Sequence, residues 1–331
     1  MAGSGLAVLR GADRPGPSAA GRAVHLLLGG GDRDEPAGRA ALPDPRPESA
    51  DHVIADFRRM RAGMAGLAFL VLTALVALTA PLFISPHDLS AVFAPGMPRQ
   101  APSGDFLLGT DGYGRSMVDV TIWGARISLT VGLLATLLAV GIGALVGVTA
   151  GHFGGWPGTV LMRVTDWFLV LPVLVLATAL ASVLKPGVGT VVVAIGVTSW
   201  PTTARVVRAQ TLSVEARPYI ERAKALGGGH WHVMRRHILP NVMPLMLAQA
   251  TLTVSGAILA EATLAFLGLG DPTKVSWGTT LQLARQVGAV SANDWWILLP
   301  PGAAIVAVAL AFTLVGRALE QVLNPRLQEQ M

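Results

Sequence analysis

The chain has 331 residues, of which 52% are hydrophobic and only 14% are charged, with a formal net charge of +5 and a mean hydropathy of +0.55. Soluble domains carry about 25% charged residues, so this composition indicates an integral membrane protein. The absence of cysteine excludes disulfides, thiol catalysis and metal sites with cysteine ligands. The bases are clustered, which predicts membrane topology rather than nucleic-acid binding.

The first 55 residues differ from the rest, because they are rich in Gly, Pro, Ala, Arg and Asp and show no sustained apolar period. Such a segment buries too little apolar surface to offset the entropy of ordering it. The apolar run at 23–31 is too short and too rich in glycine for a signal peptide. We therefore expect residues 1–55 to be a disordered cytoplasmic tail. A start codon placed too early is the alternative, since Met60 and Met64 directly precede the first long apolar run.

Six apolar segments follow, each close to the roughly 20 residues that a helix needs to cross a bilayer. They define a transmembrane domain over residues 56–331. The fourth segment is the weakest, because its apolar part is short and ends at Pro201. The second contains Gly143 and Gly147, a spacing that lets helices pack closely. The predicted spans lie near 64–84, 127–150, 160–184, 188–207, 242–267 and 296–316.

Charges in the connecting segments predict the orientation of the spans. The stretch from Ala204 to Pro240 holds seven Lys and Arg residues, whereas the loop over 85–126 holds three bases and four aspartates. Three further arginines, at 58, 59 and 61, precede the first span. Cytoplasmic loops carry an excess of Lys and Arg. We therefore expect both termini and the loop over 208–240 in the cytoplasm, and the loop over 85–126 outside.

The external loop carries Asp111, Arg115 and Asp119 at a spacing of i, i+4 and i+8. On a helix these side chains form one ion-paired stripe. Residues 112–125 are therefore predicted to form an amphipathic helix at the outer membrane surface, with Trp123 at the level of the headgroups. Its role as a protein contact or as a plain interfacial anchor stays open. Trp277, like the pair at 295 and 296, fits an aromatic belt at the same boundary.

The most basic stretch between spans is also the most interrupted. Residues 214–226 predict a helix, which the glycines at 227–229 break, because glycine is costly inside a helix and favourable in turns. Residues 230–239 predict a second short helix, which ends or kinks at Pro240.

Two kinds of site are disfavoured in this stretch. The histidines at 230, 232 and 237 do not share one helical face, and the only nearby carboxylate is Glu221, which disfavours a metal site. The G-x-x-x-x-G-K-[ST] loop that cradles nucleotide phosphates is absent from the sequence. We therefore expect ATP to be hydrolysed by other chains if it drives this protein.

The stretch YIERAKALGGGHWHVMRRHILPN (219–241) resembles the EAA loop of the permeases of ATP-binding-cassette (ABC) importers. That motif runs Glu-Ala-Ala, three residues, Gly, and then a spacer that ends in Leu-Pro. Five positions match, namely Glu221, Ala223, Gly227, Leu239 and Pro240. Arg222 departs from the usual second alanine.

Further segments resemble the second (C-type) permease of dipeptide and oligopeptide importers. They include FRRMRAGMAGLAFLVL near the first span, LLGTDGYGRSMVDVTIWGARISLTVGLLA (107–135), GHFGGW (151–156), TSWPTTARVVRAQTLS (198–213), AEATLAFLGLG (260–270), SWGTTL (276–281) and LNPRL (323–327). The resemblance covers residues 54–327. Ser116 replaces the Asp that usually follows Gly-Arg, and Asp119 stands where Ser is common.

The resemblance implies an all-α integral membrane protein with six transmembrane helices and the type I importer permease (MetI-like) fold, with both termini inside. It implies a multi-pass subunit of the prokaryotic cytoplasmic (inner) membrane that pairs with a homologous B-type permease. Two ABC ATPase subunits, which bind ATP and Mg, would drive it, and an extracytoplasmic binding protein would deliver di- or oligopeptides. No catalysis and no cofactor are expected in this chain.

Two alternatives to a peptide importer remain. Within the same family, nickel chelates or oligosaccharides are the other cargo classes. A secondary transporter or channel driven by ion gradients is the alternative from a different class, although such proteins usually carry paired intramembrane charges.

The resemblance also implies where the functional residues lie. The ATPase-coupling residues are expected at Glu221, Ala223, Ala225, Gly227, Gly228, His237, Leu239 and Pro240. Apart from the resemblance, their spacing makes Asp111, Arg115 and Asp119 candidates for contact with the binding protein, with a plain interfacial anchor as the alternative.

Glu261 lies in the outer part of the fifth span, where a carboxylate is costly and usually faces a cavity or a partner. One interpretation is a gate or a contact for the amine of the cargo. The other is a hydrogen bond across the interface with the second permease, favoured by its neighbours Ser255 and Thr263.

Overall fold

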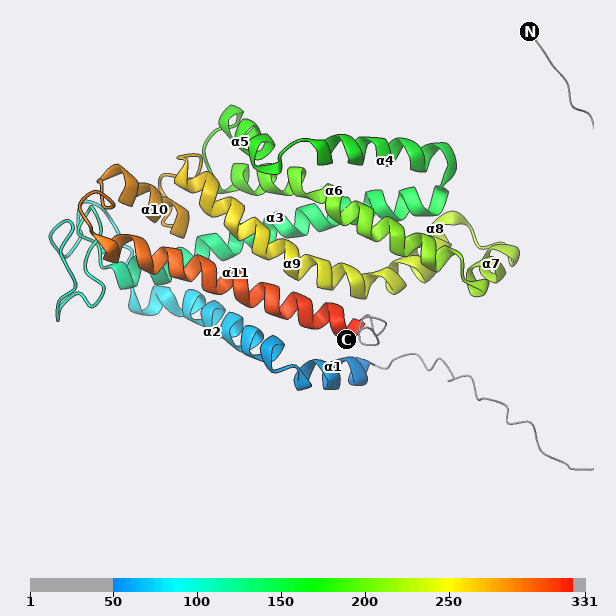
Figure 1. Ribbon diagram of the computed structural model, residues 1–331, viewed down its shortest axis with the longest axis horizontal. Coiled ribbons are helices and arrows are strands. Elements are labelled where there is room, and N and C mark those ends of the chain that lie inside the picture. The colour runs from blue at the N-terminus through cyan, green and yellow to red at the C-terminus, as the bar shows by residue number, and fades with distance from the viewer. Residues whose placement is uncertain (1–49, 324–331) are drawn as a thin grey trace, which may run out of the picture. The chain divides into compact units, whose positions relative to one another are not determined.

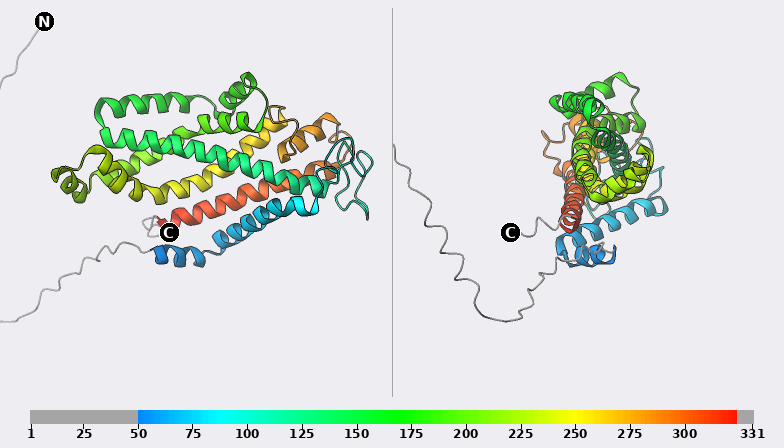
Figure 2. Two further views of the ribbon diagram at one scale, coloured as in Figure 1. Left: turned by 180° about the vertical axis from the view of Figure 1, so that it is seen from behind. Right: turned by 90° about the vertical axis from the view of Figure 1, so that its right-hand side faces the viewer.

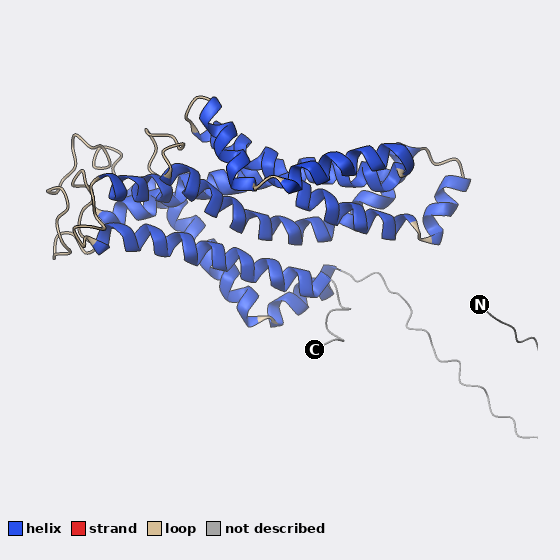
Figure 3. Cartoon of the chain, turned by 45° about the horizontal axis from the view of Figure 1, so that its top comes forward, coloured by secondary structure: helices blue, strands red, loops and turns tan. Residues whose placement is uncertain are grey.

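The computed structural model describes residues 50–323, and the named elements of this range are all helices (Figures 1 and 3). The predicted tail lies outside the described residues except for 50–55, which are the first residues of α1. In chain order the helices are α1 (Ala50–Arg59), α2 (Arg61–Phe83), α3 (Met117–Phe153), α4 (Gly155–Val170), α5 (Val173–Val183), α6 (Val188–Glu215), α7 (Pro218–Ala225), α8 (His230–Val233), the π-helical turn η1 (Met234–Ile238), α9 (Leu239–Phe266), α10 (Trp277–Gln286) and α11 (Trp295–Leu323).

Five helices within residues 50–323 are long and apolar enough to cross a membrane, namely α2, α3, α6, the continuous helix from His230 to Phe266, and α11. The third predicted span is not one straight helix, because α4 and α5 meet at 88°. The bend lies at Leu171 and Pro172, where proline has no N–H to donate and holds the preceding residue extended (φ −80°, ψ 133°).

The helices α3 and α6 pack against each other almost backbone to backbone. A Cβ atom added at Gly147 would lie 2.6 Å from the carbonyl oxygen of Ala204, and one at Gly143 would lie 2.6 Å from Cβ of Thr203. The next residue in the series, Gly151, meets Thr211 in the same way. The predicted packing role of the first two glycines is confirmed. Because each step of four along α3 matches a step of four along α6, the two helices run parallel.

This parallel packing determines how the bent pair is placed. The C-terminal ends of α3 and α6 lie together, and the 28 residues of α6 span about 40 Å, so α6 starts far from where α3 ends. The α4–α5 pair must therefore run from one end of the helices to the other (Figures 1 and 2). It serves as the sixth crossing in spite of its bend.

Close contacts at glycines give the direction of the remaining helices. Gly132 of α3 meets Ile258 of α9, and Gly66 of α2 meets the backbone of Ala311 in α11, while the adjacent turn places Gly63 against Ala318. The α2–α11 pair is antiparallel, and so is α3–α9, because Ser128, one turn before Gly132, bonds to Glu261, one turn after Ile258. Both termini of the described chain therefore lie on the same side of the helices as α7. The loop over 84–116 lies on the other side with α10 (Figure 1).

The fourth predicted span is longer than expected. Its apolar part ends at Pro201, but α6 continues through this residue to Glu215. A proline removes one helical hydrogen bond, and membrane helices tolerate this where neighbouring helices cover the freed carbonyl. Pro201 is buried where α3 packs on α6, and Gly143 lies close to the carbonyl oxygen of the preceding Trp200, so α3 supports α6 next to the proline.

We expect Gly147→Ala to lower the free energy of unfolding by about 1–3 kcal/mol, because the added methyl group overlaps Ala204 and Val207. Gly141 of the same helix is the matched control, because a Cβ atom there meets nothing within 4 Å. Thermal unfolding of the purified protein in detergent, followed by tryptophan fluorescence, measures both variants. Equal unfolding midpoints for the two variants would contradict the packing described above.

Candidate functional site

The segment over 218–238 protrudes beyond the ends of the long helices, and we call it the α7–η1 segment (Figure 1). Pro218 begins α7, at a position where its missing N–H costs nothing. The helix ends in a Schellman turn, in which the N–H of Gly227 donates to the carbonyl of Lys224 and the N–H of Gly228 donates to that of Ala223, both at 3.0 Å. The predicted break at the glycines is therefore a helix cap of known geometry.

The three glycines of this turn are not equivalent. Gly227 has φ +86°, in the left-handed region where other residues are strained. Gly228 is required by space, since an added Cβ would lie 2.7 Å from the carbonyl oxygen of Ala223. Gly229 has an extended backbone (φ −67°, ψ 161°), and a Cβ there meets nothing within 4 Å. Only the first two positions need glycine.

The sequence predicted that the following helix ends or kinks at Pro240. The helix does not end there. The chain continues from His230 to Phe266 as one helix with a π-helical turn over 234–238 directly before the proline. Within that turn the N–H of Leu239 donates to the carbonyl of Met234, one residue further back than in an α-helix. The wider turn makes room for the proline ring, which cannot donate to the preceding turn.

One face of the α7–η1 segment is anchored by apolar packing. Ile220 of α7, Val233 of α8 and Ile238 of η1 are fully buried in a cluster with Val207 and Val214 of α6. This cluster holds the segment on the ends of the long helices. The anchoring role of Ile220 was not predicted from the sequence. The available signal was that Ile220 is a large aliphatic residue directly before the charged Glu221 and Arg222.

The opposite face of the segment is open. Leu226 on this face is 89% exposed, within an otherwise basic segment. Trp231 is 71% exposed but lies on another side of the segment, beside Leu145 and Val148 of α3. A groove runs between the two helices, lined by Tyr219, Arg222, Ala223, Leu226, Gly227, Gly228, Gly229, His232 and His237. Rigidly presented apolar and basic groups beside an open groove suit contact with another protein.

The predicted coupling residues divide between these two faces. Ala223, Gly227, Gly228 and His237 line the groove, and Glu221, Ala225 and Pro240 are exposed. Leu239 is partly buried and packs against the buried cluster.

Glu261 of α9 is 3% exposed and lies where α9 meets α3 and α10. The hydroxyl of Ser128 donates to its Oε2 at 2.9 Å, and the same hydroxyl accepts from the N–H of Trp277 at 3.3 Å. The neighbours that favoured an intersubunit bond pair elsewhere, since Ser255 bonds to the carbonyl of Ala309 and Thr263 to that of Leu259. The partner of Glu261 comes from its own chain.

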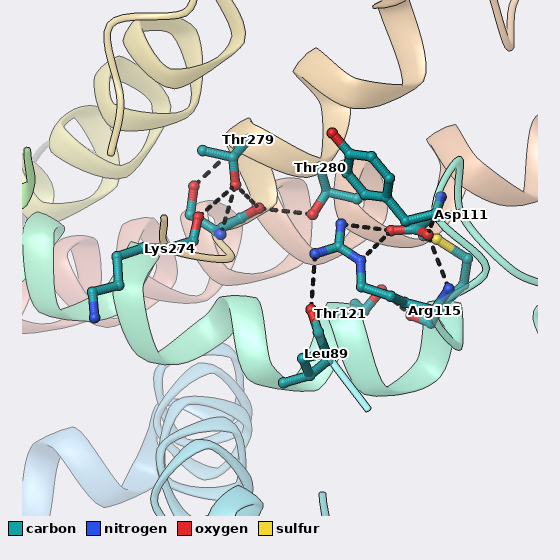
Figure 4. Close-up of polar contacts among 10 residues, drawn as sticks. Leu89, Asp111, Arg115, Thr121, Lys274, Thr279 and Thr280 are labelled. Atoms are coloured by element: carbon teal, nitrogen blue, oxygen red, sulfur yellow. Dashed lines mark hydrogen bonds and ion pairs between the residues drawn. The ribbon is translucent and has the colours of Figure 1, made fainter. Parts of the chain in front are cut away.

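The predicted helix over 112–125 starts later than expected, because α3 begins at Met117 with Ser116 as its N-cap. Asp111 and Arg115 therefore lie in the loop, and only Asp119 is helical. Arg115 donates to Oδ2 of Asp111 at 2.6 Å and to the carbonyl of Leu89 at 3.3 Å (Figure 4). No three-residue stripe forms, because Asp119 is not on the same face of one helix with the other two.

The Asp111 carboxylate is fully buried and bonds to other residues of its own loop. Its Oδ1 accepts the backbone N–H groups of Tyr113 at 2.8 Å and of Arg115 at 3.0 Å. The Arg115 guanidinium also lies over the Tyr113 ring. With both oxygens occupied, Asp111 stabilises the loop and has no free acceptor face for a partner.

Trp277 is not part of an aromatic belt. It is buried, and its indole N–H donates to the carbonyl of Thr121 at 2.8 Å. The following α10 is capped by Ser276 and Thr279, whose side chains each accept the other's backbone N–H. Within residues 50–323 no group of three His, Asp or Glu side chains is placed to hold a metal ion.

Comparison with known families covers most of the chain. The family described as binding-protein-dependent transport system inner membrane component matches residues 139–329. The N-terminal TM domain of oligopeptide transport permease C matches residues 51–102. The chain belongs to the first of these families. It is a multi-pass permease of the bacterial inner membrane, which decides against a gradient-driven secondary transporter.

Relatives of this permease share about a third of its residues. A protein of Brucella suis biovar 1 named as a peptide permease is 36% identical over 273 residues, which cover 82% of this chain and 89% of that protein. A Brucella abortus protein named as a peptide transport system permease is 36% identical, with 82% and 90% covered. The dipeptide transport system permease protein DppC of Bacillus subtilis is 35% identical over 274 residues, with 82% and 84% covered.

We expect Gly227→Ala and Gly228→Ala each to destabilise the α7–η1 segment by about 1–2 kcal/mol, the first through the left-handed backbone and the second through contact with Ala223. Hydrogen exchange of the backbone amides over 218–238 measures local opening. Gly229→Ala is the control and leaves exchange unchanged or slower. Faster exchange in Gly229→Ala than in Gly227→Ala would refute this assignment of the three glycines.

Removing the Asp111 carboxylate leaves Arg115 largely buried without its partner, and such a loss costs about 3–5 kcal/mol. We therefore expect Asp111→Ala to lower the unfolding temperature strongly and to expose the loop over 84–116 to limited proteolysis. Asp105→Ala, which removes an exposed aspartate of the same loop, is the control. Wild-type protease resistance in Asp111→Ala would show that the ion pair does not hold the loop.

Proposed function

We propose that this permease is one of two membrane subunits of an ATP-driven importer and that its cargo is peptides. The observation that carries the proposal is the match of the first span and external loop to the oligopeptide permease C segment, joined to relatives named as peptide and dipeptide permeases. The second subunit is a homologous B-type permease. An extracytoplasmic binding protein selects and delivers the cargo, so nickel chelates or oligosaccharides are the runner-up cargoes.

The α7–η1 segment is the proposed contact for one of the two ABC ATPase subunits, which bind ATP and Mg. The exposed Leu226 forms the apolar part of the contact, and Arg222 in the groove is the basic part. The buried cluster beneath them makes the contact stiff, so that a push from the ATPase moves the long helices. The excess of bases over 208–240 supports placing this end in the cytoplasm.

The opposite end is proposed to be external and to meet the binding protein. An open groove there is lined by Tyr113, Arg115, Lys274, Gln282 and Gln286, among others. These side chains can receive polar groups of a docking protein, whereas Asp111 holds the groove wall in place.

Glu261 is proposed to hold α3, α9 and α10 together near the external end. Its burial and its bond to Ser128 support this role. A gate or a cargo contact would need a carboxylate that is reachable from the translocation path.

The test is ATP-dependent uptake in vesicles that contain the two permeases and the ATPases, with binding protein and labelled peptides supplied outside. We expect uptake to require ATP, and Gly227→Glu to abolish it while membrane insertion stays intact, because the bulky charge distorts the Schellman turn that shapes the contact. Gly229→Ala is the matched control and transports normally. Normal uptake coupled to ATP hydrolysis in Gly227→Glu would exclude this segment as the coupling site, and uptake of nickel chelates but not peptides would reassign the cargo.

A further inference from the structure

A chain of four polar side chains crosses the base of the α7–η1 segment. Lys224 of α7 donates from Nζ to Oε2 of Glu215, the last residue of α6, at 2.5 Å. The other carboxylate oxygen, Oε1, accepts from Nδ1 of His152 in the last turn of α3. The second ring nitrogen of His152, Nε2, lies 2.9 Å from Nδ1 of His230, the first residue of α8. Four elements that are distant in sequence therefore meet in one network.

Each polar group of this network has a partner. The Glu215 carboxylate can only accept, so Nδ1 of His152 donates to it, and a second hydrogen bond joins the facing ring nitrogens of His152 and His230. The His152 side chain is 1% exposed, and Glu215 is mostly buried beside it. Phe153 covers the His230 ring at a centroid distance of 5.1 Å. The inner half of the network, His152 and Glu215, is buried with its polar atoms paired, whereas Lys224 and His230 at its two ends are exposed.

The position of the network gives it a mechanical consequence. Lys224 and His230 lie on either side of the glycine turn, so both helices of the α7–η1 segment are tied to the same point. That point joins α3 and α6, which are closely packed through Gly143, Gly147 and Gly151. Apolar packing alone permits sliding, whereas charge-assisted hydrogen bonds fix direction and register.

We infer that His152 is a positioning residue that transmits movement of the α7–η1 segment to the paired helices α3 and α6. The segment is joined covalently to α6 and to α9 but not to α3, so His152 supplies the polar link to the third helix. Without His152, the ATPases still bind and hydrolyse ATP, but movement of the α7–η1 segment displaces α3 and α6 less. This inference rests on the proposed coupling role of the segment.

The experiment measures peptide transported per ATP hydrolysed in vesicles with the complete complex. We expect His152→Ala and Lys224→Ala each to lower this ratio at least about fivefold, the lower range of known coupling energies, without lowering the amount of ATPase that co-purifies. Because both changes break one network, the double variant is expected to be no worse than the poorer single variant. A purely structural role would lower assembly and leave the ratio unchanged.

Lys185→Ala is the matched control, since it removes an exposed lysine from the loop between α5 and α6 and keeps the wild-type ratio. If His152→Ala fails to assemble, Lys224→Ala decides, because the Lys224 side chain is 45% exposed and its loss leaves no large cavity. Ratios within twofold of wild type in the assembled variants, or additive losses in the double variant, would overturn the inference. Absence of ATP-dependent uptake in the wild-type complex would instead reject the proposed function.

Discussion

The close packing of α3 on α6 is the constraint on which the rest of this permease depends. Three glycines at intervals of four remove the side chains that would otherwise separate the two backbones. In a membrane, where lipid is as apolar as any side chain, such close approach is a main source of helix association. Because the pair is parallel, the chain between them must cross back, and the bent α4–α5 pair makes that crossing.

Polar contacts then fasten further elements to this pair at its two ends. At the α10 end, Glu261 of α9 and the backbone of Trp277 in α10 both bond to Ser128 of α3. At the α7 end, His152 of α3 and Glu215 of α6 bond to the two helices that flank the glycine turn. Buried polar groups are costly unless paired, so these contacts specify position where apolar packing alone would not.

Local patterns predicted much of the fold and of the coupling segment. Apolar length located the spans, and the glycines at 227–229 located the break in the basic loop, because both depend on residues that are near one another in the sequence. Local reasoning left open whether the helix ends or kinks at Pro240, and it ended the fourth span at 207, whereas both helices continue beyond these points. Whether a proline ends a helix depends on what covers the freed carbonyl, and that neighbour is distant in the chain.

By itself, the sequence determined that this protein is a helical membrane protein, that it is a permease of a binding-protein-dependent transport system, and that its most basic loop carries a glycine turn. These three properties follow from the composition, from the length of the apolar segments and from short motifs. Only the tertiary structure decided that Asp111 is buried by its own loop, that Glu261 bonds to Ser128, and that His152 joins four elements. The physical reason is that a polar side chain acquires its role from its partner, and these partners lie up to 133 residues away.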